Sequence, residues 1–130
     1  MSFPILVVDD DIEDHVIMQE YFEDVNHKDS VKFAINGLEA ITYLESQKKG
    51  ELPRLIILDI NMPIMNGTQT LLHIKRDPEL KNIPVVIYST SENETEKRKT
   101  LSLGALDYIV KPHTLEEGSK MISKFLSYLE

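Results

Sequence analysis

Aspartates stand at the ends of two short apolar runs, where together they could hold a metal ion. Asp9, Asp10 and Asp11 follow the first run, and Asp59 ends a later one. Grouped carboxylates repel one another and are costly to hold together unless a cation neutralises them. Oxygen ligands without histidine or cysteine favour Mg²⁺ over zinc or copper. Because Mg²⁺ commonly completes its shell with phosphate oxygens, these acids indicate phosphoryl chemistry.

Other side chains at the ends of apolar runs suit the transfer of a phosphoryl group. A carboxylate is a competent nucleophile toward phosphorus when a metal and a fixed cation offset the charge of the transferring group, and Asp59 is the best-placed candidate. Lys111 precedes Pro112 at the end of another run and supplies the cation. Ser89 ends a further run, and its hydroxyl could bond a phosphoryl oxygen.

These residues need a fold that gathers them at one edge. Short apolar runs rich in β-branched residues alternate with segments of helical spacing, which is typical of a parallel sheet with crossover helices. The strand candidates are residues 4–9, 30–34, 55–59, 83–89 and 106–111. The first, third and fourth are continuously apolar, which favours central positions covered on both faces. We therefore predict an α/β domain of (βα)₅ type, with functional loops at the carboxyl ends of the strands.

Apolar residues recur at helical spacing between the strand candidates, so each helix is expected to bury one face. The expected buried positions are Ile12, Val16, Met18, Phe22 and Val25; Leu38, Ile41 and Leu44; Leu71, Leu72 and Ile74; and Leu115, Ile122, Phe125, Leu126 and Leu129. Ser91 and Thr114 each stand three residues before a glutamate, which is the spacing of a capping box. Asp11 is expected to cap the first helix, and Gly104 to end a helix.

The composition indicates one domain. The chain has 130 residues, of which 42% are hydrophobic and 28% charged, an ordinary mix for a globular protein. A net charge of −8 argues against a grip on nucleic acid, which depends on lysine and arginine. There is no cysteine, and the apolar run 3–8 is too short for a signal peptide or a membrane span. We expect a single cytoplasmic domain over residues 1–130 that contacts neither nucleic acid nor membrane.

At these positions the sequence resembles the CheY-like response-regulator receiver domains of two-component signalling. The matching segments are VVDDD at 7–11, LDINMPIMNG at 58–67, PVVIYS at 84–89, GA at 104–105 and KP at 111–112. Each segment is weak alone, but together and in this order they are specific, and the resemblance spans essentially the whole chain. It implies a flavodoxin-like doubly wound sheet of five parallel strands in the order 2-1-3-4-5, and one receiver domain without an output domain.

The resemblance also implies roles for single residues. Asp59 would be the phosphoacceptor, taking its phosphoryl group from a phosphohistidine of a sensor histidine kinase or a histidine phosphotransfer protein in a phosphorelay. Asp10 and Asp59 would bind Mg²⁺ directly, with the backbone carbonyl of Asn61 as a third ligand, and Asp9 would act through metal-bound water. Lys111 would pair with Asp59 and then with the phosphoryl group. No cofactor besides Mg²⁺ is expected.

By the same resemblance, Ser89 is the switch hydroxyl and Tyr108 the switch aromatic, which change position together. A new dianion gains hydrogen bonds in only one arrangement, so phosphorylation shifts a two-state population. The fourth helix, fifth strand and fifth helix would report the change to a downstream protein target, which the sequence does not identify. The first helix would dock the kinase, with Ile12, His15 and Gln19 as exposed candidates.

The stretch 83–91, with Tyr88 just before the switch, resembles small regulators paired with phytochrome-type sensor kinases. Some of these regulators dimerise, so a homodimer is one expectation for this chain. Ser89 stands where threonine is more frequent in the family, and His113 where an aromatic residue is more frequent. Neither departure removes a chemical function.

Two other functions remain open at this point. A haloacid-dehalogenase-type phosphatase also uses an aspartyl phosphate on an α/β sheet, but it usually has a second aspartate two residues past the nucleophile, where this chain has Asn61. A pseudo-receiver used only for binding would more often have lost Asp59 or Lys111. The favoured interpretation is a signalling module, which catalyses only its own phosphorylation and dephosphorylation and is not an enzyme in the ordinary sense.

Overall fold

The computed structural model describes residues 3–62 and 64–129 of the chain. Over these residues it forms a five-stranded parallel sheet in the order β2-β1-β3-β4-β5. The strands are β1 (Ile5–Val8), β2 (Val31–Ala34), β3 (Leu55–Asp59), β4 (Val85–Ser89) and β5 (Asp107–Val110). The helices are α1 (Ile12–Asp24), α2 (Gly37–Ser46), α3 (Gly67–Arg76), α4 (Glu94–Ser102) and α5 (Leu115–Ser127). The predicted flavodoxin-like fold and strand order are confirmed.

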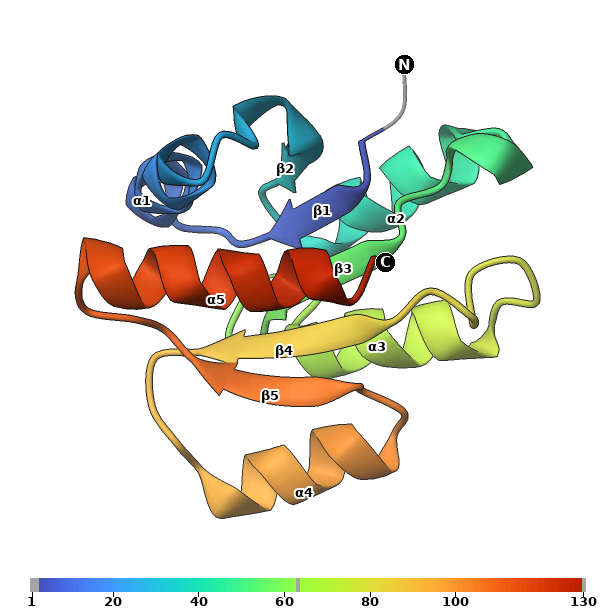
Figure 1. Cartoon of the computed structure of the whole chain (residues 1–130). Helices are drawn as coiled ribbons and strands as arrows, with labels where there is room; N and C mark the ends of the chain where they lie inside the picture. The colour runs from blue at the N-terminus through green and yellow to red at the C-terminus, as the bar shows by residue number, and fades with distance from the viewer. Residues whose placement is uncertain (1–2, 63, 130) are drawn as a thin grey trace.

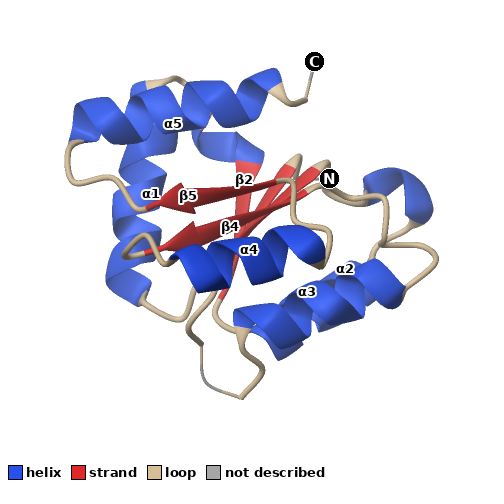
Figure 2. Ribbon diagram, turned by 90° about the horizontal axis from the view of Figure 1, so that it is seen from below, coloured by secondary structure: helices blue, strands red, loops and turns tan. Residues whose placement is uncertain are grey.

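The helices cover both faces of the sheet. Figures 1 and 2 show α1 and α5 on one face and α2, α3 and α4 on the other. Strand residues alternate between the two cores because successive side chains point to opposite faces. Val7 and Ile57 pack in the core beneath α1 and α5, whereas Val8 and Leu58 pack in the core beneath α2 and α3. Because all five strands run parallel, the loop after each strand lies at the same edge of the sheet.

The predicted central strands are also confirmed. Every residue of β1, β3 and β4 is buried, whereas the edge strands β2 and β5 contain buried, half-buried and exposed positions. A continuous apolar run therefore marks a strand with helices on both faces, as parallel sheets require. Within residues 3–62 and 64–129, none of the helices combines the length and the hydropathy that crossing a membrane requires.

Some of the predicted buried positions on the helices are wrong. Those that are at least half exposed are Ile12, Val16, Leu38 and Leu115. In α1 the buried face runs through Met18, Tyr21 and Phe22. Val16 precedes Met18 by two residues, which is about 200° around the helix, so the two side chains cannot share a face. In α5 the buried face begins one turn after Leu115, at Gly118.

The ends of the helices are fixed by side-chain caps. Asp11 caps α1 and Thr114 caps α5, each accepting a hydrogen bond from a backbone N–H in the first turn, as predicted. The predicted cap at Ser91 is wrong, because α4 begins at Glu94 and its cap is Asn93. Gly104 follows α4 with a φ of 109°, a left-handed conformation that glycine adopts without strain and that ends the helix as predicted.

Candidate functional site

Aspartates from two neighbouring strands meet at the carboxyl edge of the sheet. Val8 of β1 pairs with Leu58 of β3, so the next residues along the two strands, Asp9 and Asp59, lie side by side. Carboxylate oxygens of Asp9, Asp10 and Asp59 lie within 4.8 Å of one another. Asp9 is 1% exposed and Asp59 6% exposed, whereas Asp10 is open to solvent. The parallel register thus builds the acidic cluster that the sequence predicted.

Lys111 reaches this cluster from the end of β5. Its Nζ lies 2.7 Å from Oδ2 of Asp14 and 3.0 Å from Oδ2 of Asp9, but 3.9 Å from Oδ1 of Asp59. The ammonium group also lies 5.2 Å from the centre of the Tyr88 ring, an attractive arrangement for a cation. Lys111 is therefore near the expected partner, Asp59, and hydrogen-bonded to two other acids.

Asp14 is the residue of the charged site that the sequence did not bring forward. It lies in the first turn of α1, and its side chain is partly buried against Lys111. The helical spacing carries a signal, since Asp14 precedes the buried residues Met18 and Tyr21 by four and seven positions. An acid on the buried face of a helix needs a cationic partner, and this position could have been found in that way.

The site is short of positive charge, and the pKa values reflect this. Burial and the neighbouring Asp9 raise the pKa of Asp59 to about 7, although Lys111 opposes the change. Burial also raises the pKa of Asp9. For Lys111, burial lowers the pKa, but hydrogen bonds to Asp14 and Asp9 outweigh it and the pKa is raised overall. A further cation beside the carboxylates would be favourable, so the donor set fits a hard divalent ion.

The loop after β3 is held close to the acidic cluster by a glycine. A Cβ atom on Gly67 would lie 2.5 Å from the carbonyl oxygen of Asp59 and 2.6 Å from Cα of Ile60. Only glycine allows the start of α3 to pack this closely against the strand end. Asn61, two residues past Asp59, is exposed in this loop, and Pro63 of the same predicted motif lies outside the described residues.

The predicted switch residues meet at a glutamate of α4. Ser89 is 2% exposed, and its hydroxyl lies 3.0 Å from the carbonyl oxygen of Ser91 and 3.4 Å from Oε1 of Glu96. The hydroxyl of Tyr108, on β5, lies 2.6 Å from the same Oε1 and 2.9 Å from the same carbonyl. Burial, followed by the hydrogen bond to Glu96, raises the pKa of Tyr108. Glu96 had no signal in the sequence beyond its place in the first turn of α4.

Of the predicted docking residues on α1, only Ile12 is exposed. His15 and Gln19 are half-buried, which corrects their prediction as exposed residues. The His15 ring stacks on Phe33 and its Nε2 lies 2.5 Å from the carbonyl oxygen of Asp9. The Gln19 side chain donates a hydrogen bond to the Lys28 carbonyl. These two side chains thus make intramolecular contacts.

A second group of potential metal ligands lies on α2 and at the end of α3, apart from the acidic cluster of Asp9, Asp10 and Asp59. Ligand atoms of Glu45, His73 and Asp77, from α2 and the end of α3, also lie within 4.8 Å of one another. These side chains are exposed or half-buried. Exposed groups of this kind commonly hold no ion, so we assign them no function.

Comparison with known proteins decides the family. The sequence matches the response regulator receiver domain over residues 5–123. The chain belongs to this family. A receiver domain of two-component signalling implies a histidine kinase as partner, and the acidic pocket of Asp9, Asp10 and Asp59 is consistent with its phosphoacceptor site.

Relatives of this receiver domain include regulators of phytochromes. Response regulator Rcp1 of Synechocystis sp. is 33% identical over 127 residues, which are 95% of this chain and 86% of Rcp1. The crystal structure of the phosphorylated cyanobacterial phytochrome response regulator RcpA has a TM-score of 0.83 and 31% identity, covering 98% of this chain and 94% of RcpA. The Mn²⁺-bound form of Rcp1 has a TM-score of 0.76 and 33% identity, covering 96% of this chain and 92% of the other. The predicted resemblance to phytochrome-associated regulators is confirmed.

Proposed function

We propose that this receiver domain accepts a phosphoryl group on Asp59 from a phosphohistidine of a sensor histidine kinase or a histidine phosphotransfer protein. The observation that carries the proposal is the cluster itself. Asp59 ends a central strand, two further carboxylates lie within 4.8 Å, and an ammonium group lies 3.9 Å away. A packed core has no need of this combination of charges, whereas phosphoryl transfer to a carboxylate requires it.

The chemical step uses the carboxylate of Asp59 as nucleophile. An oxygen of Asp59 forms a bond to phosphorus as the bond between phosphorus and the donor's imidazole nitrogen breaks, and the electron pair of that bond returns to the imidazole. The product is an acyl phosphate. Lys111 offsets the added negative charge because its ammonium group already lies between Asp9, Asp14 and Asp59. Hydrolysis of the acyl phosphate by water would return Asp59 to its carboxylate.

The residues proposed to hold Mg²⁺ are Asp10 and Asp59 directly, the backbone carbonyl of Asn61, and Asp9 through a metal-bound water. Mg²⁺ would neutralise charge on the phosphoryl oxygens during transfer. Support comes from the donor set, which is all oxygen and short of positive charge. The solved structure of Mn²⁺-bound Rcp1 shows that a relative takes up a divalent ion of similar hardness.

Phosphorylation is proposed to act through a change in the positions of Ser89 and Tyr108. The Ser89 hydroxyl has one proton, which a phosphoryl oxygen on Asp59 would attract away from its present acceptors. Rearrangement of Ser89 and Tyr108 would then alter the surface made by α4, β5 and α5. The proposed binding partner of that surface is a downstream protein target or a second copy of this chain, as in a homodimer.

We propose a signalling module, with catalysis limited to its own phosphorylation and dephosphorylation. The test is incubation with Mg²⁺ and acetyl phosphate, followed by mass spectrometry of the intact protein. One phosphoryl group should be gained by the wild type and by Asp29→Asn, an exposed control, but not by Asp59→Asn. Labelling that survives Asp59→Asn would overturn the assignment. Sustained turnover of a phosphomonoester would instead favour the phosphatase.

A further inference from the structure

Glu96 occupies an unusual place for a carboxylate of the first turn of a helix. Its Oε1 lies 2.6 Å from the hydroxyl of Tyr108 and 3.4 Å from the hydroxyl of Ser89. Both hydroxyls also lie within 3.0 Å of the carbonyl oxygen of Ser91. One carboxylate thus joins the two proposed switch residues, which come from different strands, to α4.

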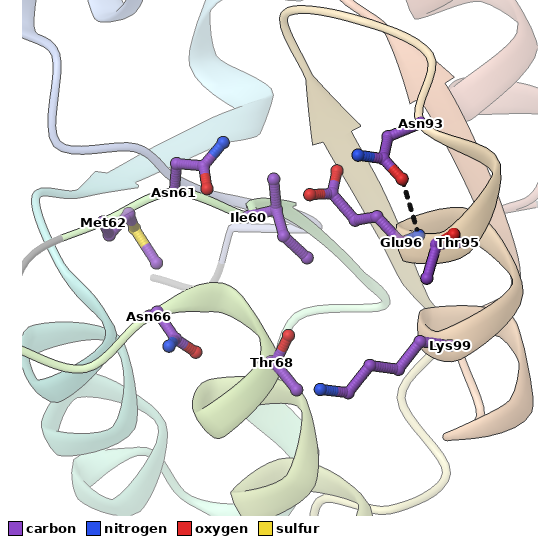
Figure 3. Close-up of a pocket in the computed structure, with 9 residues that line it drawn as sticks. All are labelled: Ile60, Asn61, Met62, Asn66, Thr68, Asn93, Thr95, Glu96 and Lys99. Atoms are coloured by element: carbon purple, nitrogen blue, oxygen red, sulfur yellow. Dashed lines mark hydrogen bonds between the residues drawn. The ribbon is translucent and has the colours of Figure 1, made fainter.

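The local backbone holds Glu96 in this place. Asn93 caps α4, and its side chain accepts a hydrogen bond of 3.0 Å from the N–H of Glu96. Figure 3 shows this bond, and it shows the Glu96 carboxylate at the edge of a cavity of about 570 Å³, pointing away from Lys99. Within the part of the chain that the structure describes, no lysine or arginine forms an ion pair with Glu96. The hydroxyls of Tyr108 and Ser89 are therefore the side-chain donors that meet its charge.

This arrangement conflicts with a phosphoryl group on Asp59. In the register of β3 and β4, Asp59 pairs with Tyr88, so Ser89 is the next residue toward the carboxyl edge. A phosphoryl dianion there would compete with Glu96 for the single proton of Ser89. It would also repel the Glu96 carboxylate that contacts this hydroxyl, since like charges at short range cost free energy.

We propose that Glu96 is a positioning residue that holds Ser89 and Tyr108 in the unphosphorylated arrangement and ties their release to α4. The proposal rests on the proposed function, because phosphorylation of Asp59 is what would draw Ser89 away. Glu96 binds one arrangement of the switch and not the other, so it opposes phosphorylation by the free energy of its contacts. Weakening those contacts should ease phosphorylation and loosen Tyr108.

The test compares Glu96→Gln with Glu94→Gln. Both substitutions remove one negative charge from the first turn of α4, but Glu94 is exposed and its carboxylate forms no hydrogen bond or ion pair with the described residues. An amide is a weaker acceptor than a carboxylate. We expect Glu96→Gln to raise the rate of Asp59 phosphorylation by acetyl phosphate about fivefold, with Glu94→Gln unchanged. Equal rates for the two variants and the wild type would overturn the proposal.

A spectroscopic measurement on unphosphorylated protein makes the test independent of the proposed function. With fluorotyrosine incorporated, the Tyr108 resonance can be assigned by its loss in Tyr108→Phe. In Glu96→Gln this resonance should shift and broaden, whereas in Glu94→Gln it should match the wild type. An unmoved Tyr108 resonance would overturn the proposal even where Asp59 is phosphorylated normally. Absence of labelling on wild-type Asp59 would instead refute the proposed function.

A double variant distinguishes whether Glu96 acts by holding Ser89 or only by charge repulsion. In Ser89→Ala the hydroxyl that Glu96 holds is gone, so Glu96→Gln should no longer change the phosphorylation rate. Non-additivity of this kind is the signature of two residues that act through each other. If Glu96→Gln still accelerates labelling in the Ser89→Ala background, the effect is electrostatic and Glu96 does not act by holding Ser89.

Discussion

Lys111 lies closer to Asp14 than to the acid it is proposed to serve. Its Nζ is 2.7 Å from Oδ2 of Asp14 and 3.9 Å from Oδ1 of Asp59. The hydrogen bond to Asp14 is of the charge-assisted kind, which is short and strong. Asp14 and Asp9 thus hold the ammonium group by hydrogen bonds, whereas with Asp59 it forms a longer ion pair. In the proposed reaction, the lysine would therefore be available for the arriving phosphoryl group.

Removing the charge of Asp14 should strengthen the ion pair between Lys111 and Asp59. In Asp14→Asn the ammonium group loses one anionic partner, so its attraction to Asp59 grows and the metal-free pKa of Asp59 falls below about 7. The measurement is a carbon NMR titration of the aspartate carboxyl groups, with the Asp59 signal assigned through Asp59→Asn. Asp29→Asn is the control. An Asp59 pKa that is the same in Asp14→Asn and the wild type would contradict the prediction.

Replacement of Lys111 should destabilise the metal-free protein. In Lys111→Met, the buried carboxylates of Asp9 and Asp59 lose their nearest cation, which we expect to cost about 3 kcal/mol in the free energy of unfolding at pH 8. The loss should be smaller at pH 5, which lies below the pKa of about 7 of Asp59, because a protonated carboxyl group needs no cationic partner. Urea denaturation at both pH values measures it, with the exposed Lys120→Met as control. A loss independent of pH would point to packing instead of charge.

The fold could be predicted from the sequence because its main signal is local. A continuous apolar run such as residues 55–58, which ends at Asp59, indicates a strand buried on both faces, and the order of such runs predicts a parallel sheet. The helix faces were predicted less well. Val16 and Met18 are both apolar, and only the position of the sheet decides that Met18 is buried and Val16 is not.

The candidate site was predictable to the extent that its residues end strands. Asp9, Asp59 and Ser89 do, and they meet at the carboxyl edge because parallel strands in register must bring them there. Asp14 and Glu96 were missed because each lies on a helix. Their contacts depend on how α1 and α4 pack against the sheet. Helical spacing places Asp14 on the buried face of α1, but no local pattern in the sequence marks Glu96.

Mg²⁺ should stabilise the folded protein through Asp10. A ligand that binds only the folded state adds about 1.4 kcal/mol at ten times its Kd. Asp10→Asn should lose most of this gain, because an amide neutralises no charge of the ion. Thermal unfolding with and without Mg²⁺ tests the prediction, and Asp11→Asn serves as the neighbouring control, since Asp11 is engaged as the cap of α1. Equal stabilisation of Asp10→Asn and the wild type would place the ion elsewhere.

The raised pKa of Asp59 predicts how stability depends on pH. The pKa rises from 3.8 to about 7 on folding, so the folded state holds this proton more tightly than the unfolded state. The contribution of Asp59 to stability is fully present below about pH 4 and is lost as the pH rises through about 7. Asp59→Asn has no such loss, and we expect it to exceed the wild type by about 2–4 kcal/mol at pH 8 and to be nearly equal to it at pH 4.

Urea denaturation of the metal-free proteins between pH 4 and 8 measures this difference, and Asp29→Asn should follow the wild type throughout. Adding Mg²⁺ should narrow the gap at pH 8, because the ion favours the charged form of Asp59 and the amide has no charge to offer it. A gap between Asp59→Asn and the wild type that stays constant across the pH range would show that burial of the Asp59 charge does not limit stability. The inference that the acidic cluster lacks enough positive charge to offset its carboxylates would then be wrong.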